Sequence, residues 1–116
     1  MLELDARRRR GTYLVITESG TRYWLWVDKR PSGFMKVISN GKVGLREGVV
    51  GGESCCPEPV VRVGDHMHLV AAGKHIVRTS VVVSITPTDV CLESLACKEC
   101  KAYRPPNAER CPVCRY

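Results

Sequence analysis

The sequence predicts an all-β protein: a small antiparallel β-barrel or sandwich followed by a C-terminal zinc ribbon. Two observations lead to this prediction. Between Gly11 and Ile85, short runs rich in β-branched and aromatic residues alternate with turn signals, without the spacing of an amphipathic helix. Further on, two Cys-x-x-Cys pairs are separated by ten residues. The expected parts are a basic N-terminal arm at 1–10, a barrel-like domain at 11–86 and a four-cysteine zinc-ribbon module at 87–116.

The barrel-like domain is expected to contain about six short strands. In the clearest one, Tyr23, Leu25 and Val27 occupy one face and Trp24 and Trp26 the other, so both faces are expected to be covered. The expected strands are Thr12–Thr17, Thr21–Asp28, Phe34–Ser39, Val60–Val63, His66–Ala72 and His75–Ile85, with Lys42–Arg46 as a return strand after the hairpin signal Asn40-Gly41. Residues 51–59 are expected to form an irregular loop, and Thr86–Asp89 to end the β pattern.

The cysteine pairs predict one structural Zn²⁺ bound by Cys97, Cys100, Cys111 and Cys114. A two-residue gap lets both sulfurs of a pair reach the same ion, and zinc prefers four such ligands at the corners of a tetrahedron. Iron is the alternative ion, because tetrahedral thiolate sites accept both metals. Unrelated thiols or two disulfides are the alternative to a metal site. The chain shows no signal peptide, and a reducing, cytoplasmic setting favours the metal.

The segment Cys97–Cys114, with its motifs CKEC and CPVC, resembles a zinc ribbon or the paired knuckles of a rubredoxin-type fold. In those knuckles a glycine often follows the second cysteine of a pair, whereas this chain has Lys101 and Arg115. The resemblance implies four thiolate ligands but no single activity, since zinc ribbons occur in transcription, RNA and ribosome-associated proteins and also as structural clips.

Residues 12–85 resemble a small β-rich protein of actinobacteria and their phages that has no assigned function. Three segments carry this resemblance, namely SGTRYWLWVD, VRVGDHMHLV and VRTSVVVSI.

The net charge of +6 is unevenly distributed along the chain. Arg7, Arg8, Arg9 and Arg10 supply four of the positive charges, and a divalent ion with four thiolates carries a charge of about −2. The rest of the metal-loaded protein is therefore formally neutral, and contacts with a polyanion depend on the arginine run or on local patches. The predicted binding residues for nucleic acid or an acidic partner are Arg7, Arg8, Arg9, Arg10, Lys98, Lys101, Arg104, Arg110 and Arg115. A solvated, disordered terminus is the alternative interpretation of the arginine run.

The aromatic residues have two interpretations. Tyr23, Trp24, Trp26 and Phe34 are assigned mainly to the core, and a base-stacking platform is the alternative. The remaining potential metal ligands are interpreted as surface histidines and buried thiols, and a second metal site is the alternative. These residues are His66, His68, His75, Cys55, Cys56 and Cys91.

No nucleophile motif, carboxylate pair or phosphate-binding loop is evident, so no catalytic residues, small-molecule substrate or enzyme activity are expected. Apolar runs are far shorter than a membrane span. The sequence therefore predicts a non-enzymatic binding module whose first candidate partner is nucleic acid. The alternatives are a protein-interaction adaptor, such as a phage-encoded factor that docks on a host protein or assembles with itself, and an iron-thiolate electron-transfer protein.

Overall fold

The computed structural model describes the chain except for residues 28–33, 42, 53–59, 72–73, 106–107 and 113–116. The described residues form eight strands and one short 3₁₀ helix, which confirms the predicted all-β class. The elements are β1 (Glu3–Asp5), β2 (Gly11–Thr17), β3 (Arg22–Val27), β4 (Phe34–Ser39), β5 (Arg46–Gly52), β6 (Val60–Arg62), β7 (His66–Ala71), β8 (Lys74–Thr88) and η1 (Leu92–Leu95).

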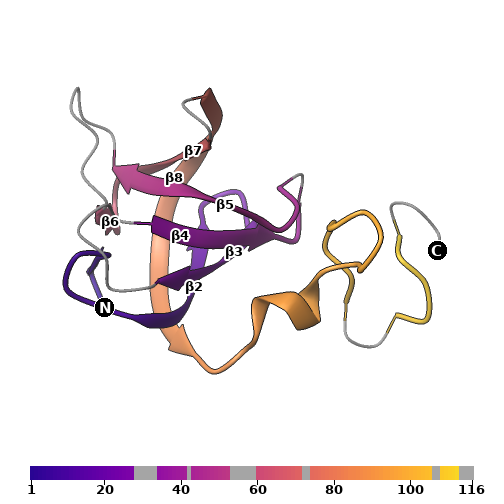
Figure 1. Cartoon of the computed structure of the whole chain (residues 1–116). Coiled ribbons are helices and arrows are strands. Elements are labelled where there is room, and N and C mark those ends of the chain that lie inside the picture. Colours follow the sequence, from indigo (N-terminus) through magenta and orange to yellow (C-terminus); the bar gives the residue numbers. More distant parts are fainter. Residues whose placement is uncertain (28–33, 42, 53–59, 72–73, 106–107, 113–116) are drawn as a thin grey trace.

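Six of the strands form a closed barrel in the order β2-β3-β4-β5-β7-β8, with every neighbouring pair antiparallel (Figure 1). The long strand β8 closes it, because its first half pairs with β7 and its second half with β2. A register shift between Ile16 and Thr17 interrupts the ladder between β2 and β8. Of the two β architectures predicted, a barrel or a sandwich, the structure shows the barrel.

The barrel interior is filled by alternate residues of the strands, as the period of two requires. On β3, Tyr23, Leu25 and Val27 point inward and are buried, which confirms the face predicted for them. The neighbouring residue Trp24 is also buried, but it belongs to a second apolar cluster outside the barrel. Both faces of β3 are therefore covered, one by the barrel interior and the other by the C-terminal segment.

Strand β8 continues to Thr88, three residues beyond the predicted end at Ile85. The pattern Thr86-Pro87-Thr88 was expected to break the strand. Pro87 instead pairs with Tyr13 in the half of β8 that has only β2 as its ladder partner. A proline is tolerated where its missing N–H can face away from the ladder.

The return strand predicted at Lys42–Arg46 was wrong, since β5 begins only at Arg46. The Ser39 hydroxyl accepts hydrogen bonds from Gly41 N (3.2 Å) and Val43 N (3.1 Å), which makes the turn wider than a two-residue hairpin. Gly51 and Gly52, predicted to lie in a loop, extend β5 and pair with His68 and Met67. Glycines suit a strand that bends sharply around a small barrel.

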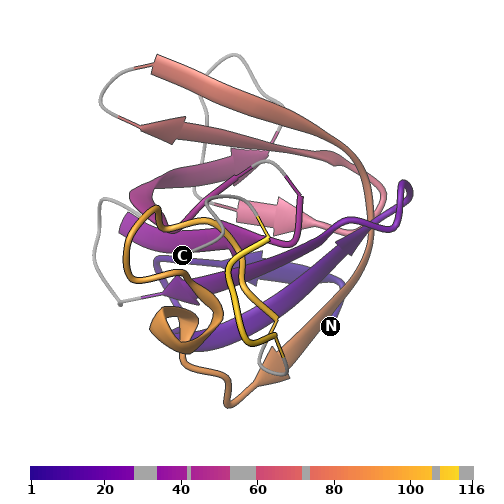
Figure 2. The ribbon, with the colours of Figure 1, turned by 90° about the vertical axis from the view of Figure 1, so that its right-hand side faces the viewer.

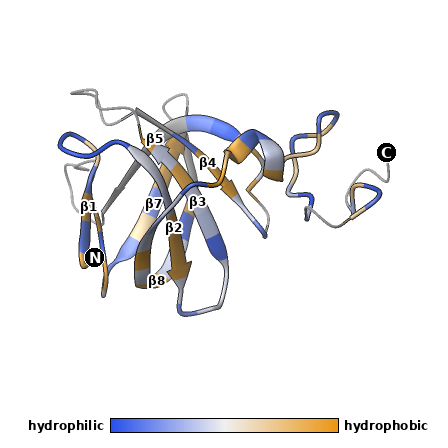
Figure 3. Cartoon of the chain, turned by 90° about the horizontal axis from the view of Figure 1, so that it is seen from below, coloured by the Kyte–Doolittle hydropathy of each residue, from blue (hydrophilic) through white to orange (hydrophobic). Residues whose placement is uncertain are grey.

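The N-terminal residues 1–10, which were predicted to form a basic arm, include a short strand that pairs with the rest of the protein. Strand β1 pairs with β6, and Leu4 is fully buried in the same interior cluster as Val61 (Figure 1). This two-stranded sheet covers the barrel on the side away from the C-terminal segment (Figure 3).

Candidate metal centre

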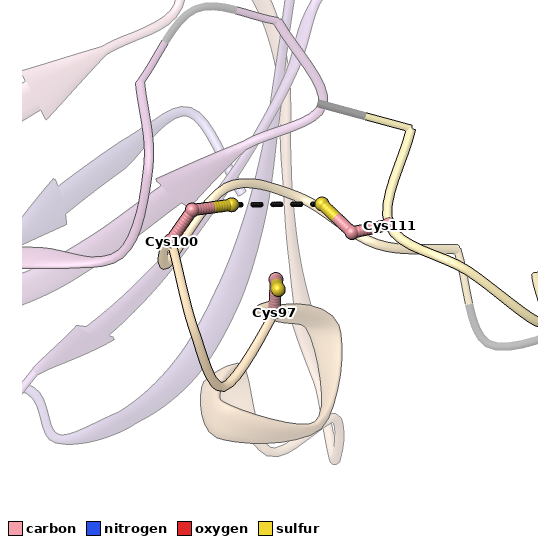
Figure 4. Close-up of side chains that lie close together, drawn as sticks. All are labelled: Cys97, Cys100 and Cys111. Carbon is pink, nitrogen blue, oxygen red and sulfur yellow. Dashed lines mark hydrogen bonds between the residues drawn. The ribbon is translucent and has the colours of Figure 1, made fainter. Parts of the chain in front are cut away.

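A tight hairpin follows η1 and positions the first cysteine pair. Ala96 and Tyr103 form an antiparallel bridge, and Cys97 N donates to Ala102 O at 2.8 Å. At the tip, Lys101 N donates to Cys97 O at 3.0 Å and closes the turn between the two cysteines. The turn places both sulfurs of the pair on one side of the hairpin, as a metal-binding knuckle requires (Figure 4).

The third cysteine joins this pair from the far side of the intervening loop. The sulfurs of Cys97, Cys100 and Cys111 all lie within 4.8 Å of one another, and those of Cys100 and Cys111 are 3.5 Å apart (Figure 4). Cys97 and Cys111 are buried, whereas Cys100 is exposed. Glu99 N donates a hydrogen bond to Cys97 Sγ at 3.4 Å.

This donor set fits a tetrahedral thiolate site. With metal–sulfur bonds of about 2.3 Å, a tetrahedron places its sulfur atoms about 3.8 Å apart. The observed spacing brackets that value. Three thiols converging on one point also contradict the interpretation of unrelated cysteines, and three described cysteines together can hold a metal ion. Cys114, the predicted fourth ligand, lies outside the described residues, as does Arg115.

Lys101 adopts the backbone conformation that a knuckle demands. Its φ is +66°, in the left-handed region, and no other non-glycine residue in the described part of the chain has a positive φ. The knuckle therefore forms without the glycine that often follows the second cysteine, at a conformational cost of about 1–2 kcal/mol for a lysine.

Replacing Lys101 by glycine is expected to raise the free energy of unfolding of the metal-loaded protein by about 0.5–1 kcal/mol, because relief of the left-handed strain exceeds the added backbone entropy of the unfolded chain. The matched control is Lys98→Gly, in the same turn but without a positive φ, which is expected to lower stability. Urea denaturation measures both values. Equal losses in the two variants would contradict a strained Lys101.

The knuckle contacts the segment between β4 and β5. In Figure 2 the C-terminal segment faces the viewer, in front of the strands of the barrel. Leu45 N, which takes no part in the barrel ladder, donates to Lys101 O at 2.7 Å. A Cβ atom on Gly44 would lie 2.9 Å from the same carbonyl oxygen, so this approach depends on glycine. Further along the hairpin, the rings of Trp24 and Tyr103 stack with centroids 5.4 Å apart and planes 9° from parallel.

These contacts were not predicted from the sequence. Predicted coverage of both faces of β3 was the one signal that pointed to them. It identified no covering segment, and the tryptophans were expected to fill the barrel core. Trp24 is buried beneath the described part of the C-terminal tail, residues 89–105 and 108–112, and Trp26 is half-buried. The side chain of Phe34 lies outside the described residues.

A cleft of about 410 Å³ lies beside η1, between the tail and the barrel. In it, Lys36 Nζ lies 3.1 Å from Glu93 Oε1 and 5.4 Å from the centre of the Trp26 ring. The thiol of Cys91 donates to Glu93 Oε2 at 3.0 Å, and this bond, with a backbone hydrogen bond and Lys36, lowers the pKa of Glu93 to about 2. Glu93 is therefore ionised at neutral and mildly acidic pH, and its contact with Lys36 links η1 to β4 over that range.

The predicted cationic residues do not form one surface. Arg7, Arg8, Arg9 and Arg10 are exposed in the turn after β1, far from the knuckle that carries Lys98 and Lys101 (Figures 1 and 3). Arg110 is exposed near Cys111. The guanidinium of Arg104 donates to Ala108 O (2.9 Å) and Glu109 O (2.9 Å), so it stabilises the loop between the two cysteine pairs.

Among the described residues, no second group of three potential ligands meets. His66 Nδ1 lies 2.7 Å from Thr79 O, and Cys91 is exposed in the cleft beside η1. Cys55 and Cys56 lie outside the described residues, and so does the side chain of His75.

Comparisons of the chain with models of known families, with curated proteins and with solved structures found no match. Within the described residues, no helix has the length and apolar character needed to cross a membrane. The resemblance of residues 12–85 to a small actinobacterial and phage protein stays a prediction.

Proposed function

We propose that this protein is a non-enzymatic binding module whose C-terminal segment is stabilised by one structural zinc ion. The convergence of Cys97, Cys100 and Cys111 is the observation that supports this proposal. When bound, zinc cross-links the knuckle that carries Cys97 and Cys100 to Cys111 at the other end of the intervening loop. With Cys114 as the fourth thiolate, the site has no open position for water or substrate, which favours a structural over a catalytic role.

Iron in the same thiolate cage would instead support electron transfer. Elemental analysis and the absorption spectrum of the purified protein distinguish the two ions, because an iron-thiolate centre is red and a zinc centre is colourless. One zinc per chain is the expected result.

For the partner, we propose nucleic acid contacted through the turn at Arg7–Arg10. This turn is ordered: Arg8 N and Arg9 N donate to Asp5 O at 3.0 and 3.1 Å. Arg7 also binds the Asp5 carboxylate through Nε (3.0 Å), and the side-chain and backbone hydrogen bonds from Arg7 lower the pKa of the Asp5 carboxyl. Asp5 thus neutralises part of the positive charge of Arg7 and Arg8, whereas Arg9 and Arg10 make no ion pair with the described residues. Their exposed guanidinium groups suit phosphate contacts.

The logarithm of affinity for a mixed-sequence DNA duplex is expected to fall against the logarithm of salt concentration with a slope of about −3, at about −0.9 for each phosphate contact. The double substitution Arg9→Ala and Arg10→Ala is expected to flatten that slope by about 2 and to weaken binding equally for all sequences. Point substitutions are preferable to deleting residues 1–10, because Leu4 is part of the core.

The matched control replaces Lys98 and Arg110, which lie near the cysteines, by alanine. An equal loss in both double variants would contradict a contact specific to the arginine turn. If the wild-type protein binds neither duplex nor single strand at low salt, a protein-interaction adaptor becomes the leading function, consistent with the formally neutral charge of the rest of the chain.

A further inference from the structure

The outer face of the barrel beneath the tail is unusually apolar for a surface. Trp24 and Ile38, on neighbouring strands β3 and β4, are buried there together with Leu92 and Leu95 of η1. Trp26, Leu45 and Tyr103 pack around this cluster and are partly buried. Without residues 92–104, this face would expose its aromatic and aliphatic side chains to water.

The residues that cover this face are interleaved with the metal ligands. Leu95 precedes Cys97 by two residues, and Lys101, whose carbonyl accepts the hydrogen bond from Leu45, directly follows Cys100. Tyr103, which stacks on Trp24, lies in the loop between the two cysteine pairs. Any change that opens the cysteine cluster therefore disturbs the covering contacts at several points.

We propose that residues 92–104 form a metal-dependent cover over the Trp24 face of the barrel, so that metal binding at the cysteine cluster and packing on this face stabilise each other. This inference rests on the proposed metal site and adds its regulation. Among the described residues of this segment, Leu92 and Leu95 are buried against the barrel face rather than in a core of the segment's own. In the metal-free protein the cover is therefore expected to open and the Trp24 face to become accessible.

Linkage between the two events is reciprocal: if metal binding favours the docked cover, docking must raise metal affinity by the same factor. Gly44 offers a way to weaken docking from the barrel side without changing a ligand. The Cβ of Gly44→Ala would meet Lys101 O at 2.9 Å and force the hairpin away from Leu45. Gly41→Ala is the matched control, because its Cβ would meet only side-chain atoms, the nearest at 3.4 Å.

The test uses the full chain and Zn²⁺ in competition with a chelator of known affinity. Gly44→Ala is expected to bind Zn²⁺ about tenfold more weakly than the wild type, and Gly41→Ala within about twofold of it. In a Trp26→Phe background, which isolates the fluorescence of Trp24, removing zinc is expected to shift the emission to the red and to increase quenching by iodide.

Unchanged zinc affinity in Gly44→Ala, or a Trp24 spectrum that stays the same while bound zinc falls from one per chain to none, would overturn the proposed cover and leave the metal site standing. A wild-type chain that binds no Zn²⁺ would overturn both the metal site and the cover.

Discussion

Replacing Cys111 by serine is expected to abolish stoichiometric metal binding and to unfold the segment that carries the cysteines. Cys111 is 1% exposed and approaches the knuckle pair from the other end of the intervening loop, so its thiolate is expected to close that loop around the metal. A structural zinc site contributes on the order of 10 kcal/mol to the folding of a small segment, because the unfolded chain has no preformed set of ligands. Loss of one ligand removes most of that contribution.

The barrel should survive this substitution. Among the described residues, its interior cluster takes none from the chain beyond Ile85. Circular dichroism is therefore expected to retain the β signal, while elemental analysis finds no metal and amide exchange becomes fast in residues 97–111. Cys91→Ser is the control, because Cys91 is exposed and lies outside the cluster. Full metal content in Cys111→Ser, or a wild-type protein that carries no zinc or iron when purified under reducing conditions, would refute the predicted site.

Replacing Trp24 by alanine is expected to lower the free energy of unfolding of the metal-loaded protein by about 3–5 kcal/mol. Trp24 is only 7% exposed, and its loss would leave a cavity between the barrel wall and the tail. It would also remove the stacking contact with Tyr103.

The same substitution at Trp26 is expected to cost distinctly less, since Trp26 is half-buried and faces the cleft that contains Lys36 and Glu93. Chemical denaturation of the two variants measures the difference. Similar losses of unfolding free energy in the two variants would contradict this difference in surroundings. Trp24 and Trp26 lie on the same face of β3, but Trp24 stacks on Tyr103 whereas Trp26 lines the cleft.

The inward and outward faces of β3 were predictable because a strand has a side-chain period of two. The sequence places Tyr23, Leu25 and Val27 on one face and the tryptophans on the other, and the structure keeps this division. Alternation does not show which partner covers a face. The partner of Trp24 comes from residues about 70–80 positions further along the chain, a long-range contact without a local signal.

The clustering of Cys97, Cys100 and Cys111 was predictable from spacing, since two residues between cysteines give both sulfurs of a pair access to one ion. The contact between Gly44 and Lys101 was not, because it depends on the approach of two backbones rather than on side-chain chemistry. Strand β1 was missed for a related reason. Three residues, Glu3–Asp5, are too short to show alternation, and only their pairing with β6 defines them as a strand.

The division of β8 between two partners gives the barrel a ladder between segments far apart in sequence, and we expect that ladder to form late in folding. The final ladder of the barrel joins Thr12 to Thr88, so the chain must bring together residues separated by most of its length before that ladder forms. Ladders with such long loops are slow to nucleate, because the entropy of closing the loop opposes them until many contacts exist. The cysteine hairpin needs only contacts between near neighbours in sequence, and it can form while the barrel is still open. The Trp24 face, in contrast, is complete only once β3 and β4 have paired. Docking of the tail is therefore expected to follow both the pairing of these strands and the formation of the cysteine hairpin.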